Sequence, residues 1–379
     1  MKRFSSKLLD EIRHIDDPRT QREPDHLLID IVTIAILATL AGADNMTAVE
    51  TYGKAKGAWL STFLELPNGI PSHDTFSRVF NLIDPEQFNR FFERLIEHIT
   101  DQLNIKLIHI DGKTLRGSYD REHQIKALHS VSAWASEHQL VLAQQRVEGK
   151  SNEITAIPHL LELLSLEGAI ITLDAMGTQR AIAEQIIKGG GDYILALKGN
   201  HGTLCKGVDQ FFEQAVSADW QGIENSYYEQ TESNHHRIEL RQVWVVPLSA
   251  VPELAHAHLW KGLNAIVMVR RKRTLWNKVE EEVSYYITSL SVDATEMAGH
   301  IRAHWSIENN CHWVLDVTFK EDRSRIRMGH GPENTGLLRR LCLGVLKRDS
   351  SKGSLVQKRY RAAMDDAFMM SLLAGAFAA

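Results

Sequence analysis

Three acidic residues in this chain have the type and spacing that divalent metal ions require. Asp111 closes the apolar run that begins at Ile105, and Asp174 closes a second apolar run that begins at Ala169. Glu308 lies much later, in a helical stretch that begins at His304. Hard cations prefer carboxylate oxygens, and two such ions together promote phosphoryl transfer. The three acids therefore predict a Mg²⁺ site, with Mn²⁺ as a substitute.

The segments that must position these acids follow a recognisable order. Strand patterns cover residues 105–111, 128–135, 139–147, 169–174 and 192–197, and helical patterns cover 152–166 and 178–188. The order β-β-β-α-β-α-β is that of ribonuclease-H-like folds, in which the first and fourth strands are neighbours. We therefore expect Asp111 and Asp174 to meet at one edge of the sheet.

The flanking regions complete an α/β fold class with four parts. Residues 1–100 are expected to form a helical N-terminal domain, which either reads DNA as a helix-turn-helix or covers the core; its mild acidity favours the cover. Residues 101–200 form the first part of a ribonuclease-H-like mixed-sheet core. Residues 201–292 form a mostly β insertion, with strands at 237–246, 264–271 and 283–290. Residues 293–379 complete the core with the Glu308 helix and a basic C-terminal region.

The amino-acid composition excludes several classes of protein. The chain has 379 residues, is 44% hydrophobic and has a formal net charge of -5, which excludes a polybasic protein. Between Arg323 and Arg361, however, eleven Lys/Arg face two acids, so this stretch is either a phosphate-binding surface or a solvated helix face. The three cysteines form no close pair, which excludes a disulfide framework and favours a reducing cytoplasm. No apolar run is long enough to span a membrane.

The stretch around Glu308 carries a second pattern. His304, Glu308 and His312 are spaced i, i+4 and i+8 and would share one face of a helix. Such spacing can bind a transition metal, but no further soft ligand accompanies it, so histidines that orient Glu308 or contact DNA phosphates are the preferred interpretation. Trp305 and Trp313 belong either to the core or to a surface that stacks on an unpaired base.

Four motifs give the chain its resemblance to a known family. They are Ile110-Asp-Gly-Lys-Thr-Leu-Arg-Gly, Leu173-Asp-Ala-Met-Gly-Thr-Gln, Ala196-Leu-Lys-Gly-Asn-His, and the stretch from His304 to Asp322. Through them the chain resembles the DDE transposases of bacterial insertion sequences, most closely the group of H-repeat-associated proteins. The resemblance covers nearly the whole length.

The resemblance implies an enzyme that cleaves the ends of an insertion sequence and joins the freed 3′-hydroxyl to target DNA. Asp111, Asp174 and Glu308 match the three catalytic acids. Related transposases carry a Tyr, an Arg and a Lys at set offsets from the Glu, whereas this chain has Ile301, His304 and Leu315 there. Phosphates must then be held by other residues.

Candidates for DNA contact are basic or polar residues that follow the motifs. Each is either a phosphate contact or an ordinary surface group. They are Lys113, Arg116, Lys198, Asn200, Arg270, Arg271, His304, His312, Lys320, Arg323, Arg325 and Arg327.

The implied partners are double-stranded DNA, as terminal inverted repeats and as target, and a second copy of the chain, because transposition pairs two DNA ends. Two alternatives remain open from the sequence. One is a domesticated relative that only binds DNA. The other is a stand-alone nuclease that shares the metal site but recognises no defined end.

Overall fold

The structure is a computed structural model that describes residues 6–19, 24–101, 103–120, 124, 126–147, 152–234, 237–251 and 254–377. Two compact units divide the chain. Unit 1 comprises residues 1–105, 112–149 and 308–379, and unit 2 comprises residues 106–111 and 150–307. None of the described helices combines the length and the apolar character that crossing a membrane requires.

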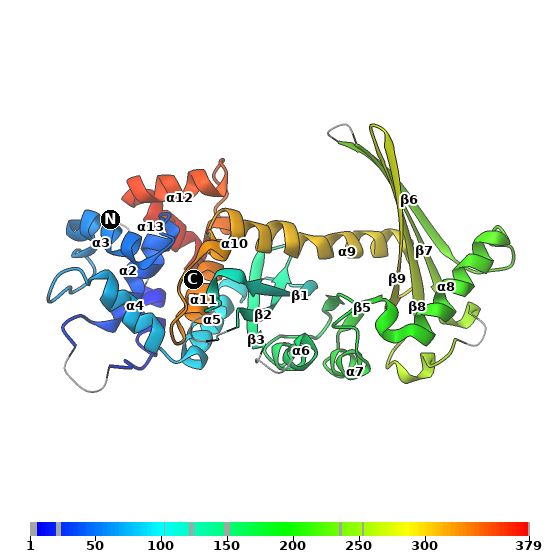
Figure 1. Cartoon of the computed structure of the whole chain (residues 1–379), viewed down its shortest axis with the longest axis horizontal. Helices are drawn as coiled ribbons and strands as arrows, with labels where there is room; N and C mark the ends of the chain where they lie inside the picture. The colour runs from blue at the N-terminus through cyan, green and yellow to red at the C-terminus, as the bar shows by residue number, and fades with distance from the viewer. Residues whose placement is uncertain are drawn as a thin grey trace. The chain divides into compact units, whose positions relative to one another are not determined.

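The strands follow the order β3-β2-β1-β4-β5-β9-β8-β7-β6. β1 pairs parallel with β4 and β4 pairs parallel with β5, whereas β2 pairs antiparallel with β3. β9 pairs antiparallel with β5 and extends the sheet through β8, β7 and β6 (Figure 1). The bounds are β1 Leu107–Leu115, β2 Leu128–Ala135, β3 Leu140–Val147, β4 Ile170–Leu173, β5 Asp192–Leu197, β6 Ser226–Asn234, β7 Arg237–Pro247, β8 Ala265–Leu275 and β9 Lys278–Thr288.

This topology confirms the expected fold class, an α/β ribonuclease-H-like mixed sheet with a mostly β insertion after a helical N-terminal region. β2 and β5 have the expected bounds. β1 differs, because it continues through Asp111 to Leu115 instead of ending at the acid. β6 was missed since its sequence, Ser-Tyr-Tyr-Glu-Gln-Thr-Glu-Ser-Asn, is mostly polar.

The helices of unit 2 support the sheet. They are α6 Glu153–Glu162, α7 Arg180–Lys188, α8 Gly202–Ser217 and α9 Ala294–Ser306. α6 and α7 lie side by side (Figure 1). α8 was not expected, although its buried Leu204, Val208, Phe212 and Ala215 repeat with helical spacing. α9 packs against β4, β6 and β7, and its buried Met297, Ala298 and Ile301 join Val243 and Val267 in one apolar cluster.

Unit 1 is mainly helical. Its helices are α1 Ser6–Ile12, α2 Leu28–Leu40, α3 Met46–Leu60, α4 His73–Leu82, α5 Pro85–Thr100, α10 Trp313–Val317, α11 Gly331–Arg348, α12 Leu355–Met364 and α13 Asp366–Phe377. The expected helix starts are confirmed: the Ser72 side chain caps α4 and the Asp84 side chain caps α5, with Pro85 in its first turn.

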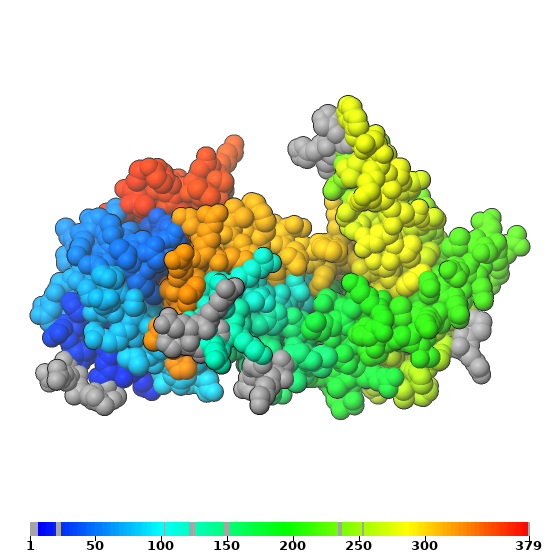
Figure 2. Space-filling model, viewed as in Figure 1, coloured from blue at the N-terminus to red at the C-terminus, as the bar shows by residue number. Residues whose placement is uncertain are grey.

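The centre of unit 1 is α11, which packs against α2, α4, α5, α13 and β3. α2 is buried nearly all round, as its uniformly apolar sequence indicates. The apolar C-terminal segment packs on this core through α13, where Phe368, Met369 and Leu373 are buried. α12 lies against the N-terminal helix α2, and Figure 2 shows the C-terminal region in red against the blue N-terminal region.

Candidate active site

The register of β1 and β4 sets the positions of the two aspartates. Ile110 pairs with Leu173 in a parallel ladder. Asp111 and Asp174 are the next residues on the two chains, so their backbones lie side by side at the roughly 5 Å spacing of neighbouring strands. The parallel register therefore places both acids at the same level of the sheet.

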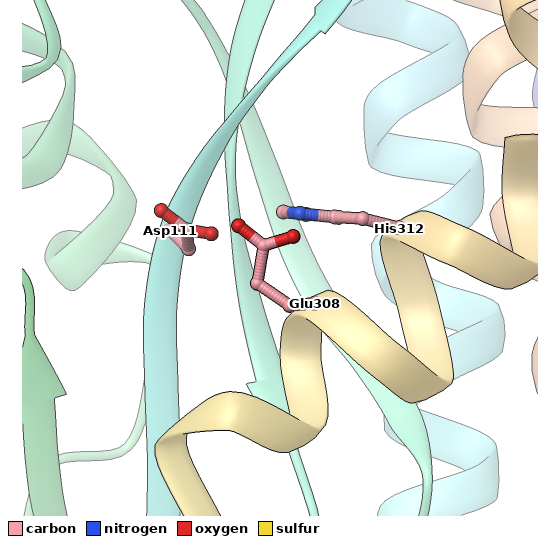
Figure 3. A group of neighbouring side chains, drawn as sticks. All are labelled: Asp111, Glu308 and His312. Carbon is pink, nitrogen blue, oxygen red and sulfur yellow. The ribbon is translucent and has the colours of Figure 1, made fainter. Parts of the chain in front are cut away.

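Glu308 and His312 approach Asp111 from the helical segment. One ligand atom from each of these three residues lies within 4.8 Å of the others. Figure 3 shows the Glu308 carboxylate and the His312 ring turned toward Asp111. Asp111 is partly exposed, Glu308 is exposed and His312 is buried. The group offers carboxylate oxygens that Mg²⁺ and Mn²⁺ prefer and one imidazole nitrogen that Mn²⁺ also accepts.

A change of helical pitch produces this convergence. α9 ends at Ser306, a π-helical segment spans Ile307–His312, and α10 follows from Trp313. A π turn holds one more residue than an α turn, so the faces on its two sides are out of phase. Glu308 and His312 lie within it, whereas His304 precedes it. The three do not share one regular α-helical face, which the i, i+4, i+8 spacing had led us to expect.

Asp174 is not part of the group of three ligand atoms. Its Oδ1 accepts a hydrogen bond of 3.0 Å from the backbone N–H of Gly177, within the turn that follows β4. Burial raises the pKa of the Asp174 carboxyl, and the charge of Glu153 raises it further, against the lowering effect of the backbone hydrogen bonds and Lys198. The acid is therefore held beside Asp111 with its ionised form disfavoured, which a bound cation would reverse.

A polar network lies immediately upstream of the acids, and sequence reasoning missed two of its three members. The Thr172 hydroxyl is 2.6 Å from His109 Nδ1 and 2.7 Å from His304 Nδ1. Burial lowers the pKa of His109 to about 3, helped by His304 and His300, and burial lowers that of His304 to about 4. His304 is thus a neutral, half-buried partner of Thr172 in this structure.

Lys113 lies in an ion pair. Its Nζ is 2.6 Å from Asp316 Oδ1 and 3.8 Å from Asp322 Oδ1, and the lysine is buried. Burial raises the pKa of the Asp316 carboxyl although Lys113 opposes this. The sequence indicated Lys113 as a phosphate contact but gave no signal for its pairing with Asp316, 203 residues away.

Four predicted DNA contacts gather in unit 1 where two loops meet. Arg116 lies in the turn Arg116–Ser118, and Arg323, Arg325 and Arg327 lie in and after the turn Glu321–Arg323. A Cβ added to Gly117 would lie 2.2 Å from the Ser324 carbonyl oxygen, so only glycine permits this approach. Arg327 Nε donates to the Gly117 carbonyl at 3.1 Å, while Arg116, Arg323 and Arg325 are exposed. We call these four residues the arginine cluster.

The remaining candidates are spread over both units. Lys198 and Asn200 are exposed beyond β5, and the Asn200 amide donates to the Ala175 carbonyl at 2.5 Å. On β8, Arg270 pairs with Glu281 and Arg271 with Glu282. Lys320 pairs with Asp44 at 2.8 Å.

The two tryptophans beside Glu308 are at the surface. Trp305 is 51% exposed and Trp313 is 59% exposed, so neither is a core residue. The Arg271 guanidinium lies over the Trp305 ring, 5.9 Å from its centroid.

Comparison with known families identifies the chain. The family described as "Transposase DDE domain" matches residues 103–344, and the family described as "DDE_Tnp_1-associated" matches residues 9–96. The chain belongs to the DDE transposase family. This family generally uses divalent metal, and Asp111, Glu308 and His312 form a group that could hold such an ion.

Curated relatives support the assignment along the whole chain. "Putative transposase YncI" of Escherichia coli O157:H7 is 38% identical over 97% of this chain and 94% of the relative. "H repeat-associated putative transposase YhhI" of Escherichia coli K12 is 37% identical over 97% of this chain and 98% of the relative. An "Uncharacterized protein in dhlA 3'region" of Xanthobacter autotrophicus is 44% identical over 74% of this chain and 93% of the relative.

A solved piggyBac transposase synaptic complex with hairpin DNA aligns with 99% of this chain and 80% of that chain, at a TM-score of 0.46 and 10% identity. The order and directions of β1 to β5, rather than this alignment, identify the ribonuclease-H-like core.

Proposed function

We propose that this DDE transposase cleaves the ends of an insertion sequence and joins the freed 3′-hydroxyl to target DNA. The observation that carries the proposal is the convergence of Asp111, Glu308 and His312 within 4.8 Å, with Asp174 beside Asp111 in register. Acids from two neighbouring strands and one helix are the donor set that phosphoryl transfer with two metal ions requires.

The donor set fits divalent cations. Asp111, Asp174 and Glu308 would hold them, and His312 would either complete the set or orient Glu308. When bound, such ions lower the pKa of an attacking water or hydroxyl and neutralise charge on the leaving oxygen. The protein's contribution is to fix the carboxylates: β1 and β4 set the aspartates, and the π-helical segment presents Glu308.

The balance of the two steps is simple. In cleavage, a water oxygen bonds to the scissile phosphorus and the bond to the 3′-oxygen breaks, which leaves a 3′-hydroxyl. In joining, that hydroxyl oxygen bonds to a target phosphorus and the target's own P–O3′ bond breaks. One site therefore serves both steps, because both are in-line displacements at phosphorus.

DNA binding is proposed to use the arginine cluster together with Lys198 and Asn200. Arg116, Arg323 and Arg325 are exposed, and Arg327 anchors the loop that presents them. Phosphate contacts of this kind position a duplex without reading its sequence. Because two ends must be paired for joining, we propose that the active species is a dimer or larger on double-stranded DNA.

Joining provides the test of this proposal. A duplex with a pre-cleaved 3′-hydroxyl end, carrying the sequence that flanks the gene, is incubated with supercoiled plasmid and Mg²⁺ or Mn²⁺. Wild type should join the end to the plasmid, and Asp111→Asn, Asp174→Asn and Glu308→Gln should not, although all should still bind the duplex.

The matched control is Glu296→Gln. Glu296 is an exposed acid near the start of α9, twelve residues before Glu308, and it pairs with the partly exposed His300. This control should join at the wild-type rate. If any of the three site variants joins at the wild-type rate, the acid replaced in that variant is not catalytic. Cleavage at random positions without joining would favour the stand-alone nuclease.

A further inference from the structure

The network of His109, Thr172 and His304 connects the three elements that carry the three acids. His109 is on β1, Thr172 is on β4 and His304 is on α9. The Thr172 hydroxyl is within hydrogen-bond distance of both Nδ1 atoms, and the two rings meet edge to face at 5.7 Å. All three residues belong to unit 2.

Each residue of the network precedes one of the three acids by a short, fixed distance in the sequence. His109 is two residues before Asp111 and Thr172 is two residues before Asp174, so each shares a strand face with its acid. His109 and Thr172 are themselves a cross-strand pair. His304 lies four residues before Glu308, in the last turn of α9 before the π-helical segment that begins at Ile307.

The hydroxyl is a single shared donor. Thr172 has one O–H hydrogen, so it donates to one Nδ1 and accepts from the N–H of the other when both rings are neutral. The two histidines then carry opposite tautomers. An apolar side chain at 172 would remove both hydrogen bonds at once. His109 is fully buried and Thr172 is 2% exposed, so no bulk water would replace the lost partner.

We propose that Thr172, with His109 and His304, is a positioning site that fixes the height and rotation of α9 on the sheet, and so holds Glu308 at metal-binding distance from the aspartates. This inference rests on the proposed function. A metal-binding constellation tolerates errors of only about 0.5 Å, and a displacement of about 1 Å can cost roughly 100-fold in rate.

The test compares Thr172→Val, which deletes the hydroxyl, with Thr172→Ser, which keeps it. The first readout is the rise in melting temperature on titration with Mn²⁺, which requires no turnover. The second is the initial rate of cleavage of an end duplex. Thr172→Val should need at least about 10-fold more Mn²⁺ for half the thermal shift and cleave about 100-fold more slowly. Thr172→Ser should restore both.

Thr288→Val is the matched control for the loss of a buried hydroxyl. Thr288 is also fully buried, and its hydroxyl donates to the Tyr193 carbonyl at 2.7 Å; it lies on β9, which β5 separates from β4. This control should lose stability without a change in the Mn²⁺ midpoint. If Thr172→Val does not fold, the hydrogen bond between Thr172 and His304 is removed instead by His304→Phe on α9. His304→Asn, which keeps a hydrogen-bonding group, should then restore both readouts.

The outcomes separate this inference from the proposed function. If Glu308→Gln loses the Mn²⁺ shift while Thr172→Val keeps the wild-type midpoint and rate, the positioning site is refuted and the proposed function stands. If Thr172→Val lowers only the melting temperature, as Thr288→Val does, the network is merely structural and the inference is wrong. If wild type shows neither a Mn²⁺ shift nor cleavage, the proposed function fails and the inference fails with it.

Discussion

At the scale of residues, metal binding depends on which carboxyl groups the fold keeps from ionising. Asp174 is the clearest case, because burial raises the pKa of its carboxyl above the usual value near 4. Asp111 and Glu308 lie beside His312 instead, where a cation could bind both carboxylates. The sequence predicted Asp111 and Asp174 because acids that end apolar runs are visible as a pattern, and it predicted Glu308 from a helical stretch; the catalytic role of all three stays a prediction. It could not show that Asp174 is engaged by its own turn.

The raised pKa of Asp174 gives a prediction with a defined sign. The folded state holds the proton more tightly, so wild type loses stability as pH rises from the unfolded pKa through the raised folded value. In EDTA at neutral pH, Asp174→Asn should therefore unfold at higher urea than wild type, and the difference should vanish near pH 3. Mn²⁺ should stabilise wild type and not the variant. Equal urea midpoints at neutral pH would contradict this.

The Lys113–Asp316 ion pair gives a second prediction at this scale. Lys113→Met leaves the half-buried Asp316 carboxylate without its cation and should cost about 2 kcal/mol, less than the roughly 3–5 kcal/mol of a fully buried pair. The double variant Lys113→Met/Asp316→Leu should recover most of the loss. Urea unfolding checks both, and Arg116→Ala, at an exposed site, serves as the control with little change. A double variant no more stable than the single one would refute the pairing argument.

At the scale of elements, strong local patterns were enough to predict β2, β5 and the caps of α4 and α5. Elements that depend on tertiary context were not. β6 is polar and forms because β7 offers it a ladder. The π-helical segment, Ile307–His312, has no sequence pattern that would distinguish it from a regular α-helix. The extension of β1 beyond Asp111 likewise depends on its neighbours in the sheet.

The start of α9 offers a prediction for an element. Asp293 Oδ1 accepts hydrogen bonds from the backbone N–H groups of Thr295 and Glu296, at 2.8 and 3.0 Å. Asp293→Ala should lower the free energy of unfolding by about 1 kcal/mol, whereas Asp293→Ser should cost little because serine also caps. Thermal unfolding measures both. His304, which is hydrogen-bonded to Thr172, lies between Asp293 and Glu308, so neither variant should change the Mn²⁺ concentration at half the thermal shift. A changed Mn²⁺ midpoint would show that the loss of the cap moves the whole of α9.

At the scale of the whole molecule, the net charge of -5 conceals a local group of exposed cations, Arg116, Arg323 and Arg325. The sequence predicted Arg323, Arg325 and Arg327 as phosphate contacts from their alternation. It did not show that the turn carrying Arg116 lies beside them, because that contact depends on the glycine at 117 and a segment 207 residues away. DNA affinity should therefore depend on residues from both segments together.

The arginine cluster predicts a measurable salt dependence. Each lost phosphate contact should reduce the slope of log affinity against log salt by about 0.9. Arg323→Ala/Arg325→Ala should therefore flatten the slope by roughly 1.8 on an end duplex. Arg13→Ala is the control, because Arg13 is exposed but already paired with Asp10 at 2.5 Å. Fluorescence anisotropy at several salt concentrations measures the slopes. An unchanged slope in the double variant would place the DNA elsewhere.

The most direct measurement is cleavage of an end-labelled linear duplex that carries the sequence flanking the gene. Wild type and Glu308→Gln are compared in Mg²⁺, in Mn²⁺ and in EDTA. We predict a nick at one defined position with either metal, none in EDTA, and none from Glu308→Gln despite normal binding. Specific binding without any nick from wild type, or an equal nick from Glu308→Gln, would contradict it.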